Sequence, residues 1–414
     1  MQVPSEQTGR TLRATPQAPA IRANVEGSFA WEVLHRRHPV LIEYLNNLNP
    51  YPASIQERLA ALRRELAEEP IQHLPGEAHD RAAWDVWGAG YFGTPWPEAP
   101  SLWAESYFHR RLLDAVAFFD PGIWFHIDPF APIKETDLCG PALADDLRAL
   151  SELTSLPAFE GTLALLLAAL WGNQLDLGFR LGMAAVSGSD GTAERLIVDD
   201  TRAIRDMLHA AAPSRICIVA DNAGRELLAD LALVDHLLGH GLASHVTLQV
   251  KPYPHFVSDA VPSDVMTCLR MLAHPPKPIA EIGAVAEIGE IREMGRRLSA
   301  AMRDGRLAVT DHWFFCSSQS FHHLPDDLME TYAGTDLTVL KGDLNYRRLV
   351  GDCRWPPDTQ FASVTAYFPS PVAALRVHKS EVAVGVQSAL VLALAAADVD
   401  WRIDGRYGTV QLRV

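Results

Sequence analysis

An acidic residue and an amide stand side by side at Asp221 and Asn222, directly after an apolar run from Ile216 to Ala220. The run is typical of a buried strand, and the segment from Glu226 to Gly239 repeats its apolar residues at helical spacing. In open α/β sheets, ligands bind beyond strand ends that lead into such turns. A carboxylate and an amide offer hard oxygen ligands to a divalent cation there. Both residues are also preferred as helix caps, so a structural role remains an alternative.

A third oxygen ligand, Asp259, follows the next predicted strand, Val246 to Val250, and lies 38 positions after Asp221. Adjacent parallel strands joined by one helical crossover need about that separation, so both strand ends should face one crevice. Oxygen ligands without a cysteine or histidine cluster favour Mg²⁺ or Mn²⁺ over zinc, while Co²⁺ and Ni²⁺ remain open. We therefore predict that Asp221, Asn222 and Asp259 hold a divalent metal and form the catalytic centre.

The segment LKGDLNYRRLVGD, from Leu340 to Asp352, crowds charged and polar residues at another strand end. Placing such residues there is costly unless they are solvated or bind a ligand. Gly342 would allow the backbone to approach a ligand closely. A solvated turn with an aspartate cap explains the segment equally well.

Two cations, Arg376 and Lys379, follow a further predicted strand in the segment LRVHKSE. Cations that face a metal held by carboxylates suit a phosphoryl group, because metal and side chains can share its charge. Taken singly, both would be ordinary surface residues. Asn173 ends an apolar helix, where it would either cap that helix or form a polar wall of the cleft.

Several other polar residues favour structural roles. His322 and His323 could pair with Cys316 as base and nucleophile, but no nucleophile elbow or third partner accompanies them. His35 and His38 lie about one helical turn apart without an obvious carboxylate partner, which favours a solvated face.

The composition excludes several classes of protein. With 414 residues, one large or two moderate domains are expected. A net charge of -15 argues against nucleic-acid binding, although a metal or local cations can still attract an anionic metabolite. Five cysteines without paired spacing indicate a reduced, cytoplasmic protein. No apolar run reaches the roughly 20 residues that span a bilayer, so no membrane contact is expected, and the oligomeric state is left open.

Three regions of different character are predicted to position these residues. Residues 1–26 are rich in proline, glutamine and threonine and are predicted to be a disordered lead-in. Residues 27–190 are predicted to be helical, interrupted by an aromatic, proline-rich segment. Residues 191–414, after a loop signal at Gly188 to Gly191, are predicted to form a Rossmann-like α/β domain that carries the metal and the catalytic residues. Strands that alternate with helices indicate a mostly parallel sheet covered on both faces.

The expected elements can be given by their ranges. Besides the strands already named, strands are predicted at 307–309, 337–340, 361–367 and 375–377, with two short strands in 401–414 around a turn at Asp404-Gly405. Helices are predicted at 55–68, 102–119, 142–153, 201–211, 226–239, 262–273 and 282–304.

The motifs DNAGREL, FVSD, KGDLNYRRLVGD and LRVHK resemble those of the metal-dependent damage-control phosphatases. The match is to the subfamily that includes a protein described as an acidic-residue methyltransferase. KGDLNYR with an Asp-Asn pair far upstream is the specific signal, and supporting similarity covers most of the chain from Ser28 onward. The resemblance implies a Rossmann-like core with a helical N-terminal region, and hydrolysis of small phosphomonoesters such as ketose phosphates.

The resemblance also implies roles for individual residues. It implies a divalent metal at the matching Asp221, Asn222 and Asp259. It implies substrate contacts from Lys379 and from one continuous segment, Asp343, Leu344, Asn345, Tyr346 and Arg347. The subfamily's late motif reads Arg-Thr-x-Lys, and here Val377 replaces the threonine. Both cations remain, so we expect phosphate binding to persist while a hydroxyl contact is lost.

Three hypotheses follow. The first is a metal-dependent phosphatase of metabolite damage control that acts on sugar phosphates such as fructose 1-phosphate or fructose 6-phosphate, with Lys379, Arg376 and Arg347 neutralising the phosphate. The second is an S-adenosylmethionine-dependent carboxyl (glutamate) O-methyltransferase, for which DNAGREL offers one glycine where several are usual. The third is a non-catalytic metabolite-binding protein, which is disfavoured because charges gathered at strand ends are costly to bury without a ligand.

Overall fold

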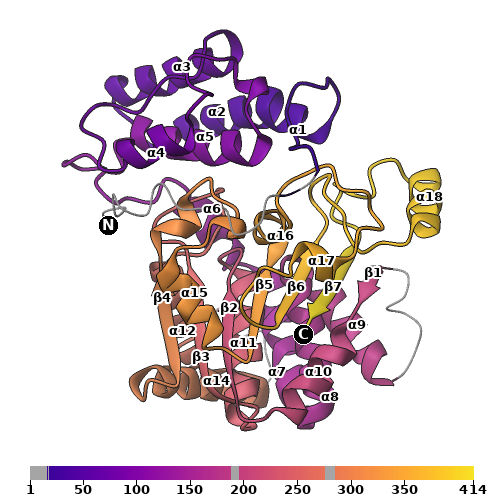
Figure 1. The fold of residues 1–414 in the computed structure, drawn as a ribbon. Helices are drawn as coiled ribbons and strands as arrows, with labels where there is room; N and C mark the ends of the chain where they lie inside the picture. The colour runs from indigo at the N-terminus through magenta and orange to yellow at the C-terminus, as the bar shows by residue number, and fades with distance from the viewer. Residues whose placement is uncertain (1–15, 17, 188–194, 276–284) are drawn as a thin grey trace.

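Seven strands form one mostly parallel sheet (Figure 1). The structure is a computed structural model that describes residues 16, 18–187, 195–275 and 285–414. In chain order the strands are β1 Leu196–Asp199, β2 Ser214–Val219, β3 Ala243–Val250, β4 Leu307–Asp311, β5 Leu337–Lys341, β6 Val372–Val377 and β7 Gly408–Arg413. Across the sheet they lie in the order β1-β7-β6-β5-β2-β3-β4, and only β6 and β7 pair antiparallel. The predicted α/β fold is confirmed.

Helices cover the sheet and form a further layer beyond the carboxyl ends of its strands. The helices before β1 are α1 Phe29–Glu32, η2 Val33–Arg37, α2 His38–Leu48, α3 Ala53–Glu68, α4 Arg81–Trp87, η3 Trp96–Glu98, α5 Ser101–Ala115, α6 Ala131–Asp137, α7 Pro141–Thr154, α8 Ala158–Leu170, η4 Gly172–Gln174 and α9 Leu175–Ser187. The later helices are α10 Thr201–Ala210, α11 Arg225–Gly239, α12 Pro262–Ala273, α14 Val285–Arg303, η6 Trp313–Cys316, η7 Phe321–His323, α15 Asp326–Ala333, α16 Gly342–Val350, α17 Phe361–Val364 and α18 Ser388–Ala397.

The strand order creates a switch point at the centre of the sheet. From β2 the chain winds through β3 to β4 on one side, and it then returns to β5 and β6 on the other side of β2. Ligands of open α/β sheets bind beyond the carboxyl ends of the strands at such a point. Asp221 and Asn222 follow β2, and Asp343 lies at the start of α16, directly after β5. The strand order therefore puts both polar segments at this switch point.

One face of the sheet is covered by helices from both halves of the chain. Buried residues of α7, α8 and α11 form one hydrophobic core with Ile216 and Ile218 of β2. Helix α8 is apolar around most of its surface and is buried from Gly161 to Leu170, as expected for a helix inside a layered core. Helices of the predicted N-terminal region thus cover the sheet directly, while the division at residue 190 stays a prediction.

Helices α1 to α5 form the layer at the top of Figure 1, beyond the carboxyl ends of the central strands. Its aromatic residues, among them Tyr107 and Phe108 of α5, share a second hydrophobic core with Val219 of β2 and Leu340 of β5. This layer is anchored from the N-terminal side, where the Ile21 amide donates to the Asp352 carbonyl at 3.1 Å. Most of the predicted lead-in, residues 1–15 and 17, lies outside the described residues; within the described part Ile21 is buried and tied to the α/β core, and the boundary at residue 26 stays a prediction.

Two predicted strands are wrong. Residues 361–367 form helix α17 and turns, because Thr365 closes a helical turn onto the Phe361 carbonyl with both its amide and its hydroxyl. The turn places Phe361 and Val364 on one buried face. In the segment 401–414 only the second strand, β7, exists. Trp401 is fully buried, and the residues after it form turns closed onto the Asp400 carbonyl.

The remaining expectations for secondary structure are largely met. The edge strand β1 was not predicted, whereas the predicted helices at 201–211, 226–239 and 262–273 correspond to α10, α11 and α12 within a residue at each end. The loop signal at 188–191 and the start of the helix predicted at 282–304 lie outside the described residues. None of the helices in the described ranges is both long and apolar enough to cross a bilayer.

Candidate active site

The structure brings the three predicted metal ligands together. Asn222 and Asp259 form an isolated antiparallel bridge, and the Ala260 amide donates to the Asp221 carbonyl at 2.8 Å. This pairing joins the turn after β2 to the loop after β3, as the one-crossover spacing predicted. Asp221, Asn222 and Asp259 are all buried.

Hydrogen bonds fix the orientation of the Asn222 amide. Its Nδ2 donates to Asp221 Oδ2 at 3.1 Å and to Glu226 Oε2 at 2.8 Å. Its Oδ1 accepts a hydrogen bond from Ser258 Oγ at 2.6 Å. An amide oxygen carries two lone pairs, so Oδ1 retains one acceptor position beside the serine.

Glu226, in the first turn of α11, is a member of the site that the sequence analysis missed. Its Oε1 accepts from Lys341 Nζ at 3.2 Å, and the same ammonium donates to Asp230 Oδ1 at 2.7 Å. All three side chains are buried. The spacing held a signal, because a carboxylate four residues after Asn222 faces the same side once the helix begins.

Negative charge accumulates around Asp221. Burial raises the pKa of Asp221 well above its ordinary value, the nearby carboxylates of Glu226 and Asp259 raise it further, and Lys379 and Lys251 oppose this only in part. Burial also raises the pKa of Asp259, although Lys251 Nζ lies 3.1 Å from its Oδ2. Carboxylates so arranged are stabilised by an additional cation.

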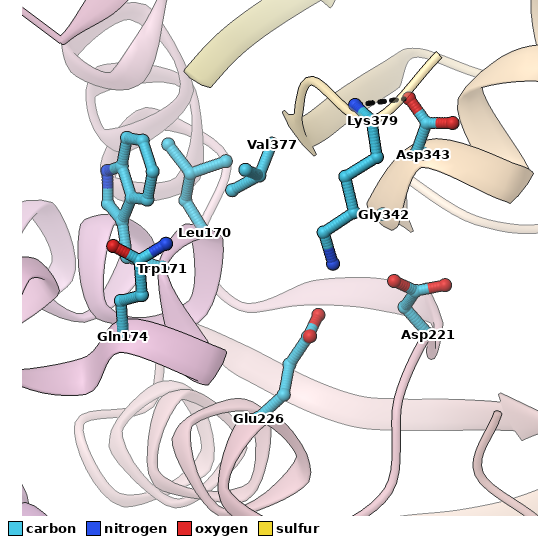
Figure 2. A pocket seen from close by; sticks show the side chains of 9 residues that line it. All are labelled: Leu170, Trp171, Gln174, Asp221, Glu226, Gly342, Asp343, Val377 and Lys379. Atoms are coloured by element: carbon cyan, nitrogen blue, oxygen red, sulfur yellow. Dashed lines mark hydrogen bonds between the residues drawn. The ribbon is translucent and has the colours of Figure 1, made fainter. Parts of the chain in front are cut away.

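Lys379, in the loop after β6, contributes a cation that faces this cluster. In Figure 2 its ammonium points into the space between Asp221 and Glu226. The backbone around Lys379 is held by Asp343, whose Oδ1 accepts from the Lys379 amide at 3.3 Å and from Ser380 Oγ at 3.1 Å. The side chain of Lys379 is otherwise exposed and can meet a ligand.

Arg376 has a different position from the one the motif suggested. It is fully buried, donates to Asp343 Oδ1 at 2.7 Å, and bonds the Val382 carbonyl and Ser380. Burial alone would raise the pKa of Asp343, but Arg376 and Arg347 outweigh it and hold that pKa below its ordinary value. The Arg376 guanidinium thus positions the Lys379 loop through Asp343 and does not line the cavity described below.

The remaining residues of the predicted substrate segment divide into two groups. Leu344 and Arg347 line the cavity, but Arg347 is paired with Glu105 and Asp352 at 2.7 and 2.8 Å. Asn345 and Tyr346 are buried, and neither lines the cavity. The Asn345 amide donates to the carbonyls of Ala220 and Lys341 and so ties β2 to β5, while the Tyr346 hydroxyl donates to Gln411. The side chain of Asn173 lies outside the described residues.

A cavity of about 540 Å³ lies between the carboxyl ends of the central strands and the N-terminal helices. From the sheet it is lined by the predicted ligands and by charged residues of later strand ends, namely Asp221, Asn222, Ser258, Asp259, Asp343, Arg347 and Lys379. From the N-terminal helices it is lined mainly by Phe29, Val33, Arg37, His38, Val40, Leu41, Tyr44, Glu105 and His109. Phe256, Val257 and Leu344 complete the sheet side, so both walls combine polar and apolar side chains.

The residues present fit a divalent cation that prefers oxygen ligands. Among the described residues, no three His, Cys, Asp or Glu side chains are grouped to hold a metal, and the donor set here is the carboxylates of Asp221 and Asp259 with the amide oxygen of Asn222. Gly342 lies against the Asp221 carboxylate with a φ of +83°, and a Cβ there would lie 2.0 Å from Asp221 Oδ2. The backbone approach predicted for Gly342 is therefore directed at the Asp221 carboxylate.

Similarity to known proteins extends over nearly the whole chain. A family model described as the damage-control phosphatase ARMT1-like domain matches residues 33–391. Proteins named damage-control phosphatase ARMT1 are 28% identical in Danio rerio, over 95% of this chain and 96% of that protein, and 26% identical in Homo sapiens, over 93% and 96%. A solved structure of a DUF89 family protein from Pyrococcus horikoshii has a TM-score of 0.48 and 14% identity, over 92% of this chain and 96% of that one. Because the family model spans most of the chain, this protein belongs to the damage-control phosphatase ARMT1-like family, which confirms the resemblance carried by its motifs and the predicted class of enzyme, a phosphatase.

Proposed function

We propose that this protein is a divalent-metal-dependent phosphatase for small phosphomonoesters in metabolite repair, with fructose 1-phosphate and fructose 6-phosphate as the first candidate substrates. The observation that carries the proposal is the convergence of Asp221, Asn222 and Asp259 with the exposed Lys379 ammonium in one cavity. Family membership supports the reaction type, and the cavity volume is ample for a hexose phosphate.

Different side chains of the cavity have different roles in binding a phosphate. A bound divalent ion would be held by Asp221, Asn222 and Asp259 and would supply Lewis acidity to the phosphoryl oxygens. Lys379 neutralises further phosphate charge from the opposite side, in the arrangement that stabilises charge developing in the transition state. Asp343 and Arg376 hold the Lys379 loop in place, and the N-terminal helices line the part of the cavity left for the organic end of the substrate.

Metal removal tests the proposal directly. Purified protein with Mn²⁺, Mg²⁺, Co²⁺ or Ni²⁺ is expected to release inorganic phosphate from fructose phosphates, and excess EDTA is expected to lower the rate by about 100-fold or more, because charge stabilisation by the ion is lost. Re-addition of metal after removal of EDTA should restore the rate. Turnover that EDTA leaves unchanged, or no turnover across a broad phosphomonoester panel, would contradict the proposal.

The methyltransferase alternative has less support at the turn where its cofactor would bind. Gly224, with a φ of +72°, is the single glycine of that turn, and a Cβ on it would lie 2.1 Å from Asp137 Oδ2. The same carboxylate accepts the Arg225 amide at 2.8 Å, so an acidic side chain occupies the start of α11. Calorimetry with S-adenosylmethionine discriminates between the phosphatase and the methyltransferase. Micromolar binding of this cofactor without metal would favour the methyltransferase.

Ser258→Ala is expected to weaken metal binding without abolishing it. The substitution removes the 2.6 Å hydrogen bond that orients Asn222 Oδ1, and such supporting hydrogen bonds change metal affinity by about 10-fold. Calorimetric titration with Mn²⁺ measures the change. Ser263→Ala, at the start of α12 and outside this cavity, serves as the matched control and should leave the affinity unchanged.

A further inference from the structure

Two buried histidines line the active-site cavity from the N-terminal helices. His38 opens α2 and is 5% exposed, and His109 lies on α5 and is 4% exposed. His38 stacks on Phe108 with ring centroids 3.8 Å apart, and His109 stacks on Phe256 at 4.8 Å. Aromatic stacking therefore fixes both rings at the wall of the cavity. The solvated face expected for His38 is wrong, because the N-terminal layer packs over it.

Neither imidazole has a hydrogen-bond partner within the described chain. Nδ1 of His38 and Nδ1 of His109 are both buried without a partner. Polar atoms buried in this way cost free energy, and most of those in native proteins are paired. Nε2 of either ring is not among these inaccessible atoms and has no hydrogen bond within the described residues, so Nε2 is the atom of each ring that can meet a ligand in the cavity.

The two rings differ from the other polar groups of this wall. Glu105 is paired with Arg347, and Arg37 and Tyr44 are exposed and can be hydrated. Burial lowers the pKa of His38 to about 3, and burial together with His38 lowers the pKa of His109 well below its ordinary value. Both rings are therefore neutral near pH 7, and a neutral imidazole offers one donor and one acceptor. With Nδ1 inaccessible, Nε2 of each ring is a donor or an acceptor according to the tautomer, and a hydroxyl group can pair with either.

We propose that His38 and His109 are specificity-determining residues that hydrogen bond with hydroxyl or carbonyl oxygens in the organic part of the substrate. The inference rests on the proposed phosphatase function and deepens it. The phosphate is matched by the metal-binding residues and Lys379 on the sheet side, so the N-terminal wall meets the rest of the molecule. Beside them the wall carries the apolar side chains of Phe29, Val33, Val40 and Leu41, and the two imidazoles make it selective for hydroxylated phosphomonoesters over aryl or alkyl ones.

The test compares two substrates in the same variants. His38→Phe and His109→Phe keep the ring stacking and remove the hydrogen bonds, so each is expected to lower kcat/KM for fructose 1-phosphate about 10-fold or more, mainly through KM, because a site built for a hydroxyl discriminates by pairing it. For phenyl phosphate, which carries no hydroxyl, kcat/KM should change less than about threefold. His109→Gln retains a donor and an acceptor and should recover part of the loss.

A buried histidine outside the cavity controls for effects on folding. His322 is 2% exposed and stacks on Tyr367 at 4.1 Å, and His322→Phe should leave both substrates unaffected. Equal losses on both substrates, or no loss on either, would overturn the proposal. If the wild-type protein hydrolyses no phosphomonoester, the proposed function fails, and calorimetry with fructose 1-phosphate then decides the histidine assignment. Weaker binding in both phenylalanine variants supports it, and unchanged binding overturns it.

Discussion

Asp221→Asn is expected to lower phosphatase kcat/KM by about 10³-fold while raising the thermal stability of the metal-free protein. Activity falls because the amide removes one of two anionic ligands and weakens the hold on the cation. Stability rises because Asp221 is buried beside Glu226 and Asp259, whose charges repel its own. Removing a buried like charge of this kind is expected to contribute about 1–2 kcal/mol.

The opposite signs distinguish a functional carboxylate from a structural one. Asp235, on the same helix as Glu226, is also buried but is paired with Arg297 at 2.7 Å and lines no part of the cavity. Asp235→Asn should therefore leave kcat/KM unchanged and lower the melting temperature. Melting curves recorded in EDTA, with phosphate release assayed in Mn²⁺, measure both quantities. A metal-free Asp221→Asn protein less stable than the wild type would refute the charge argument.

The core of the site could be predicted because its signals are local. Asp221 and Asn222 follow an unmistakable buried strand, and Asp259 lies one crossover further along the chain, so parallel pairing alone brings the strand ends together. Glu226 could have been predicted from the same signal, since it lies in the first turn of the helix that Asn222 precedes. The spacing of residues at strand ends and helix starts is therefore enough to predict which of their side chains lie close together.

The other parts of the site depend on contacts between distant segments. The sequence does not show that the Arg376 guanidinium donates its hydrogen bonds to Asp343, Ser380 and Val382. These partners come from the end of another strand and from the loop that follows Arg376 and folds back over it. Nor does it show that His38 lines the candidate active-site cavity, because only the packing of the N-terminal layer determines which face of α2 is buried. Likewise the apolar and aromatic pattern of 361–367 suits a strand, and tertiary contacts select a helical turn there.

Gly342→Ala is expected to disrupt the site at its most crowded point. A Cβ on Gly342 would lie 2.0 Å from both Cγ and Oδ2 of Asp221, and the φ of +83° is unfavourable for any residue with a side chain. Asn222 donates a hydrogen bond to this carboxylate, and the charges of Glu226 and Asp259 act on it, so its displacement would disturb the predicted metal ligands as a group. We expect kcat/KM to fall by about 100-fold or more through displacement of Asp221.

The substitution Gly405→Ala is a control that distinguishes the steric clash at Gly342 from the conformational cost of a positive φ. It has a similar φ of +77°, but the nearest atom to a Cβ there is Val377 Cγ1 at 3.9 Å, so only the conformational penalty applies. Gly405→Ala should destabilise the protein by about 1 kcal/mol and leave metal affinity intact, whereas Gly342→Ala should lose stability, metal affinity and activity together. Denaturant unfolding, Mn²⁺ titration and phosphate release on both variants provide the comparison. Wild-type metal affinity in Gly342→Ala would contradict the prediction that the Asp221 carboxylate, in its position against Gly342, is a metal ligand.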